Sequence, residues 1–169
     1  MYYFRQDEGL LEHPYHRSRV AHDLDDYCGT VLGAKAQGLP VKLALELEWL
    51  PGREQELAEL VSPYPWDFLL GSVHLLDGEA VDMEPGAWAG REVEEVGRRY
   101  FAELAALVRS GLADVLAHPD LVKIYDRRPD ADTVAACHEQ AARAAAEGGV
   151  AVEVSTAGLR KPVGELYPD

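Results

Sequence analysis

Short apolar runs bounded by glycine, proline or aspartate recur along the chain. Runs of this kind are typical of strands that are buried on both faces of a sheet. Four of them are predicted to be strands, at residues 42–49, 68–75, 113–118 and 149–155.

Between these runs, apolar residues follow a helical period. Residues 23–37 form one such stretch, which Gly38 and Pro40 bring to an end. Further helices are expected over residues 55–61, 93–108 and 132–147. The alternation of strands and helices predicts a parallel α/β sheet or part of a (β/α) barrel, in a single domain.

Composition narrows the class of protein. The chain has 169 residues, of which 47% are hydrophobic, enough for one domain with a sizeable core. No apolar run approaches the roughly 20 residues that span a bilayer, and residues 1–8 do not resemble a signal peptide. We therefore expect a cytoplasmic protein without a membrane partner, in which Cys28 and Cys137 are reduced thiols.

The formal net charge of −14 is the strongest compositional signal. A surface with this charge repels nucleic acid and anionic membranes, so neither is an expected partner. A small phosphorylated substrate would need a metal ion or a local group of cations to bind.

Polar side chains occur where the predicted strands end. Glu46 and Glu48 close the first strand, His74 closes the second and His118 closes the third. Because the carboxyl ends of parallel strands share one edge of a sheet, these side chains should converge. Carboxylate and imidazole groups are ligands for zinc, manganese or iron. The alternative is that the histidines have structural roles in a buried sheet.

Glu46 and Glu48 are two residues apart, so both should face the same side of their strand. A solvated face is the simplest interpretation. Inside a barrel, however, two carboxylates are costly unless they are paired or bound to metal. One would then be a ligand and the other its support.

Two cations follow the fourth strand. Arg160 and Lys161 could bind phosphate oxygens, although they could equally be solvent-exposed loop residues. The remaining histidines have no spacing typical of a metal motif, and we expect structural or surface roles for them: His13, His16, His22 and His138.

The residues at the strand ends resemble the motifs of the PHP (polymerase and histidinol phosphatase) superfamily. Residues 45–52 are similar to G-L-E-V-D-Y-x-P-G, residues 71–74 match G-S-V-H, and residues 117–123 resemble G-H-x-D-L-I-K. Residues 153–168 resemble E-V-N-T-S-G-L-R-K followed by E-I-Y-P. This last motif is closest to histidinol-phosphate phosphatases.

The resemblance implies a distorted (β/α)7 barrel, of which this chain would supply about four parallel βα units. It also implies up to three divalent metal ions (Zn, Mn or Fe) at the carboxyl-terminal rim. By similarity, Glu46 would be a bridging carboxylate ligand, and His74 and His118 would be imidazole ligands. Arg160, with Lys161, would contact the substrate phosphate. Glu48 and Asp120 would support the site rather than bind metal.

By the same resemblance, the family's activity is hydrolysis of a phosphate ester by a metal-bridged hydroxide. L-histidinol phosphate, an intermediate of histidine biosynthesis, is the expected substrate, and another small phosphate ester is the alternative.

The family's H-x-H, E-H and S-D-A-H strands are not recognised here, so residues 1–169 are expected to form an incomplete PHP domain. An inactive fragment is therefore a second hypothesis. A third is a binding module that self-associates through open barrel edges, which a strictly monomeric mass in light scattering would contradict.

Overall fold

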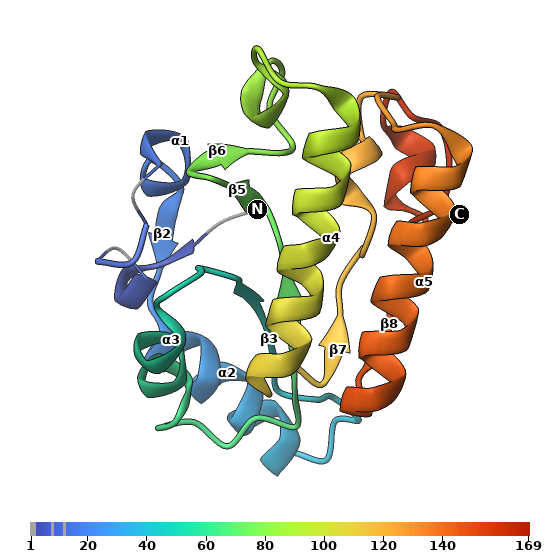
Figure 1. Ribbon diagram of the computed structural model, residues 1–169. Helices are drawn as coiled ribbons and strands as arrows, with labels where there is room; N and C mark the ends of the chain where they lie inside the picture. Colours follow the sequence, from blue (N-terminus) through green and yellow to red (C-terminus); the bar gives the residue numbers. More distant parts are fainter. Residues whose placement is uncertain (1–2, 8, 12) are drawn as a thin grey trace.

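A four-stranded parallel sheet lies at the centre of the molecule, with strand order β3–β4–β7–β8 (Figure 1). The computed structural model describes residues 3–7, 9–11 and 13–169. The four strands are β3 (Ala44–Glu48), β4 (Phe68–Ser72), β7 (Val115–Leu116) and β8 (Ala151–Val152). The predicted strands therefore occur, each beside the next one along the chain.

Helices connect successive strands of this sheet, as predicted. They are α3 (Glu54–Val61), α4 (Val93–Ser110) and α5 (Ala131–Gly148), and a further predicted helix, α2 (Leu24–Ala36), precedes β3. The long helices α4 and α5 pack side by side (Figure 1). Asp23 caps α2 and Asp130 caps α5 through side-chain hydrogen bonds to backbone N–H groups, which satisfies donors that a helix start leaves unpaired.

Two predicted strands are much shorter than the sequence pattern indicates. The expected strands 113–118 and 149–155 keep only two ladder residues each, β7 and β8. Beyond β7, His118 turns into a left-handed conformation with φ 29°. After β8, the backbone N–H of Glu153 still donates to the carbonyl of Leu116. The chain then leaves the sheet.

Several short elements were not predicted from the sequence. The strands β1 (Tyr3–Phe4) and β2 (Val20–His22) form a separate parallel pair. Residues 73–74 interrupt the predicted strand 68–75, and Leu75 begins a small antiparallel hairpin. The hairpin strands and the remaining short helices are β5 (Leu75–Leu76), β6 (Glu79–Ala80), α1 (Pro14–Arg17), η1 (Arg5–Asp7), η2 (Gly86–Trp88), η3 (Leu121–Lys123) and η4 (Ala157–Arg160).

The β8 side of the sheet is open. Val152 and the following Val154 are 44% and 69% exposed, and among the described strands β8 pairs with β7 alone. The expected self-association through this edge stays a prediction. In the described part of the chain, no helix combines the length and apolar character needed to cross a membrane.

Helix α4 approaches β4 closely at Gly71. A Cβ atom at this position would lie 2.7 Å from a methyl carbon of Leu107 and 2.8 Å from Cβ of Ala113. Real Cβ atoms essentially never come this close to other atoms, and Leu107 is fully buried. The glycine therefore lets the helix pack against the strand that leads to His74.

We expect Gly71→Ala to lower the free energy of unfolding by about 1–3 kcal/mol, because overpacking forces shifts in a close-packed core. Urea unfolding followed by circular dichroism measures this. The control is Gly33→Ala in α2, where a Cβ meets nothing within 4 Å and alanine favours the helix. Equal stabilities of the two variants would contradict the packing argument.

Candidate metal centre

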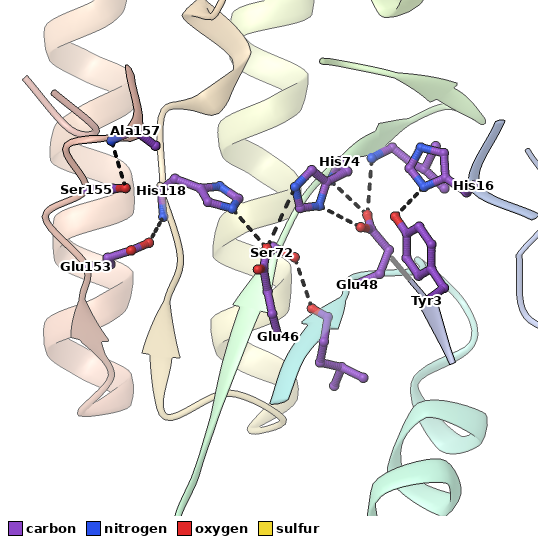
Figure 2. Close-up of polar contacts among 12 residues, drawn as sticks. Tyr3, His16, Glu46, Glu48, Ser72, His74, His118, Glu153, Ser155 and Ala157 are labelled. Atoms are coloured by element: carbon purple, nitrogen blue, oxygen red, sulfur yellow. Dashed lines mark hydrogen bonds and ion pairs between the residues drawn. The ribbon is translucent and has the colours of Figure 1, made fainter. Parts of the chain in front are cut away.

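Three candidate ligands converge at the carboxyl end of the sheet (Figure 2). Glu46 lies on β3, His74 follows β4 and His118 follows β7, so three neighbouring strands each contribute one residue. One donor atom from each lies within 4.8 Å of the others. Glu46 Oε1 is 3.0 Å from His118 Nε2 and 3.8 Å from His74 Nε2. The structure thus brings together the three residues that the sequence singled out.

Glu46 lies near Nε2 of the His74 ring, and Glu48 contacts the opposite ring nitrogen, Nδ1. Oε1 of Glu48 accepts hydrogen bonds from the backbone N–H groups of His74 at 2.8 Å and of Leu75 at 3.2 Å. Its Oε2 lies 2.8 Å from His74 Nδ1. A proton on Nδ1 that donates to this carboxylate leaves the lone pair of a neutral ring on Nε2, beside Glu46. Glu48 therefore fixes both the position and the tautomer of His74.

The two carboxylates change the acid–base properties of the cluster. Burial opposes a charge on His74, but the proximity of Glu48, its hydrogen bond and Glu46 outweigh this effect and raise the pKa of His74. Burial also opposes ionisation of Glu46. The hydrogen bond from His118 and the nearby His74 nevertheless lower the pKa of the Glu46 carboxyl. Without a metal ion, the two carboxylates therefore favour a proton on the His74 ring.

His118 is held differently. Its φ of 29° is uncommon for a residue with a side chain, and such conformations cost about 1–3 kcal/mol. Its backbone N–H donates to Oε2 of Glu153 at 2.8 Å. Within the described residues, its buried Nδ1 has no hydrogen-bond partner. The His118 ring meets the cluster through Nε2, beside Glu46, and packs edge-on against the His74 ring, with the ring centroids 5.0 Å apart.

Asp120 belongs to a neighbouring buried ion cluster. It lies 2.8 Å from Nζ of buried Lys123 and accepts a hydrogen bond from the backbone N–H of Asp169. Burial keeps the pKa of Asp120 above its ordinary value despite this lysine. The cluster ties the segment before Asp169 to the loop after β7. A supporting role of Asp120 for the metal ligands stays a prediction.

A second group of metal-type side chains, Asp120, His138 and Asp169, lies in this cluster. Lys123 Nζ is 2.8 Å from one of these carboxylates and 2.9 Å from the other. The ammonium group therefore already occupies the position that a cation would take.

Arg160 and Lys161 lie in the segment after β8, at the end of η4, and both side chains are exposed. Within the described part of the chain, neither side chain makes a hydrogen bond or an ion pair. They are thus not committed to a structural ion pair there, and their binding of phosphate stays a prediction.

The N-terminal histidines divide between the surface and the core. His22 is exposed, whereas His16 is 2% exposed and hydrogen-bonds through Nδ1 to the hydroxyl of Tyr3. Figure 2 places this pair beside Glu48. The structural role expected for His16 fits this burial. The proximity of Tyr3 to the cluster has no signal in the sequence.

The sequence, compared with known protein families, shows the family of this chain. Residues 9–157 match the PHP domain. The chain belongs to the PHP domain family. This match includes the three candidate ligands and the loops that follow β3, β4 and β7.

Two relatives extend this assignment. A "Probable histidinol-phosphatase" of Deinococcus radiodurans is 38% identical over 133 residues, which are 77% of this chain and 50% of the relative. The chain thus spans about half the length of this curated relative.

A crystal structure of histidinol phosphate phosphatase from Lactococcus lactis, complexed with Zn, L-histidinol and phosphate, superimposes with a TM-score of 0.71 at 19% identity. The match covers 86% of this chain and 58% of that chain. At this identity the likeness concerns the fold, and it confirms the expected partial PHP-type barrel.

In the metal-free protein, we expect His74 to titrate above its ordinary pKa of about 6.5. A raised pKa means that the stability contributed by protonated His74 is fully present below that ordinary value. It is lost as the pH rises through the pKa of the folded state. Glu48→Gln removes the largest attractive charge and should lower the pKa, which an NMR titration of the ring measures.

The matched control is Glu139→Gln on α5, whose carboxylate is 71% exposed and pairs with Arg143. This variant should leave the His74 titration unchanged. An unaltered pKa in Glu48→Gln would contradict the assigned electrostatic role of Glu48.

Proposed function

We propose that this chain provides the central part of a metal-dependent phosphomonoesterase of the histidinol-phosphate phosphatase type. The convergence of Glu46, His74 and His118 within 4.8 Å, in a chain of the PHP family, carries this proposal. A phosphatase named after histidinol phosphate occurs among both its sequence relatives and its structural relatives.

The donor set fits a divalent ion. One carboxylate oxygen and two imidazole nitrogens suit Zn, Mn or Fe, and three protein ligands leave a position for water or substrate. Glu48 already orients His74 in the tautomer that a ligand needs. A bound ion would lower the pKa of a water molecule and neutralise phosphate charge. We propose one ion on these three residues, within a family site of up to three.

The proposed substrate is a small phosphate ester, with L-histidinol phosphate as the first choice. The net charge of −14 disfavours nucleic acid, and Arg160 with Lys161 offers exposed cations for the phosphate. A cytoplasmic location is part of the proposal. The two buried free cysteines, Cys28 and Cys137, are compatible with a reducing compartment.

The length of the relatives supports a second candidate function. This chain covers 50% and 58% of the two related phosphatases. Residues 1–169 would then be one incomplete PHP domain that binds metal without turnover.

Metal binding is tested by isothermal titration of the purified protein with Zn²⁺. We expect binding by the wild type, and an affinity lower by about tenfold or more in Glu46→Gln and His118→Ala, because each removes a proposed ligand. Glu147→Gln, an exposed carboxylate on α5, is the matched control. Unchanged Zn²⁺ affinity in both ligand variants would rule out this centre.

Turnover is tested with L-histidinol phosphate in the presence of Zn²⁺ or Mn²⁺. If the wild type is active, Arg160→Ala should raise KM by roughly 10–100-fold, since a charge-assisted hydrogen bond contributes about 1.5–3 kcal/mol. Arg143→Ala, exposed on α5, should leave KM unchanged. Turnover by the wild type excludes the second candidate, whereas stoichiometric metal without turnover supports it.

A further inference from the structure

Glu153 contacts the candidate ligand His118 from the neighbouring strand. Its backbone N–H donates to the carbonyl of Leu116 at 2.9 Å, which continues the ladder between β7 and β8 by one residue. This register brings the Glu153 side chain to the left-handed turn at His118. There its Oε2 accepts the backbone N–H of His118 at 2.8 Å (Figure 2).

A hydrogen bond to an ionised carboxylate is stronger than one between neutral groups, and it acts here on a strained residue. The φ of 29° at His118 is uncommon for a residue other than glycine, so its surroundings must hold it. Glu153 supplies an acceptor for the backbone N–H group that His118 presents in this conformation. Its side chain is half-buried, so solvent competes only partly for the contact.

The comparison with His74 shows why this contact matters. Glu48 holds His74 by its backbone N–H and by ring Nδ1 together. The Nδ1 atom of His118 has no such partner among the described residues. Nε2 faces Glu46 and the ring packs edge-on against His74. Beyond these two contacts, the direction of the His118 ring depends on its backbone.

We propose that Glu153 is a positioning residue, which holds the backbone of His118 so that Nε2 points to the metal position beside Glu46. Each histidine of the centre is then held by a carboxylate from an adjacent strand: His74 by Glu48 on β3, and His118 by Glu153 after β8. This inference rests on the proposed function, because it assigns His118 as a ligand.

Zn²⁺ titration of the full chain tests the proposal. We expect Glu153→Ala to weaken Zn²⁺ binding by about 10–100-fold, the usual effect of losing a residue that orients a ligand. Glu153→Gln keeps an oxygen acceptor and should recover most of the affinity. Glu139→Ala, which removes an exposed carboxylate from α5, should bind as the wild type does.

A second readout needs no metal. Amide hydrogen exchange of His118 in the metal-free protein should be faster in Glu153→Ala than in the wild type, with exchange in α4 and in β4 unchanged. Exchange that is faster throughout the molecule, without rescue by Glu153→Gln, would indicate a general structural role and overturn the proposal.

The outcomes separate this inference from the proposed function. Equal Zn²⁺ affinity of the wild type and Glu153→Ala, with weaker binding by His118→Ala, overturns the role of Glu153 and leaves the metal centre standing. Absence of Zn²⁺ binding by the wild type overturns the metal centre, and the role of Glu153 with it.

Discussion

The geometry of this candidate centre depends on the hydrogen bonds that the buried carboxylate of Glu48 makes with His74 and Leu75. This carboxylate accepts hydrogen bonds from the first two backbone N–H groups of the segment that begins at His74, and it contacts the ring of His74 as well. A buried carboxylate without such partners would be costly, so the chain after β4 must turn to meet it. The turn sends the chain into the β5–β6 hairpin and presents His74 to Glu46.

The need of buried charges for partners also explains why three carboxylates and two imidazoles can share one edge of an acidic protein. Glu46 is near both rings, and each histidine also has a carboxylate at its backbone N–H, Glu48 for His74 and Glu153 for His118. The raised pKa of His74 reflects this negative charge, and a divalent cation would compensate it more completely. The geometry and charge of these residues therefore suit a positive ion.

The neighbouring cluster around Lys123 uses the same kinds of side chain for another purpose. There an ammonium group fills the position between Asp120 and Asp169 and ties the segment after η4 to the loop after β7. Arg160 and Lys161 lie between β8 and this anchored segment, so the chain is held on both sides of them. The two clusters differ in that a lysine ammonium lies between the carboxylates of the second one.

The sequence by itself determined the family, the alternation of strands and helices, and the residues that meet at the sheet edge. Strand ends, helix caps such as Asp130 and the motif around His74 depend on nearby residues, and the ends of parallel strands share one edge of a sheet. Tertiary structure decided the rest: the shortness of β7 and β8, the left-handed turn at His118, and the approach of Tyr3 to Glu48. The contact between Glu153 and His118 joins residues 35 positions apart. It follows from the register between two strands, which the hydrophobic pattern of either strand alone does not specify.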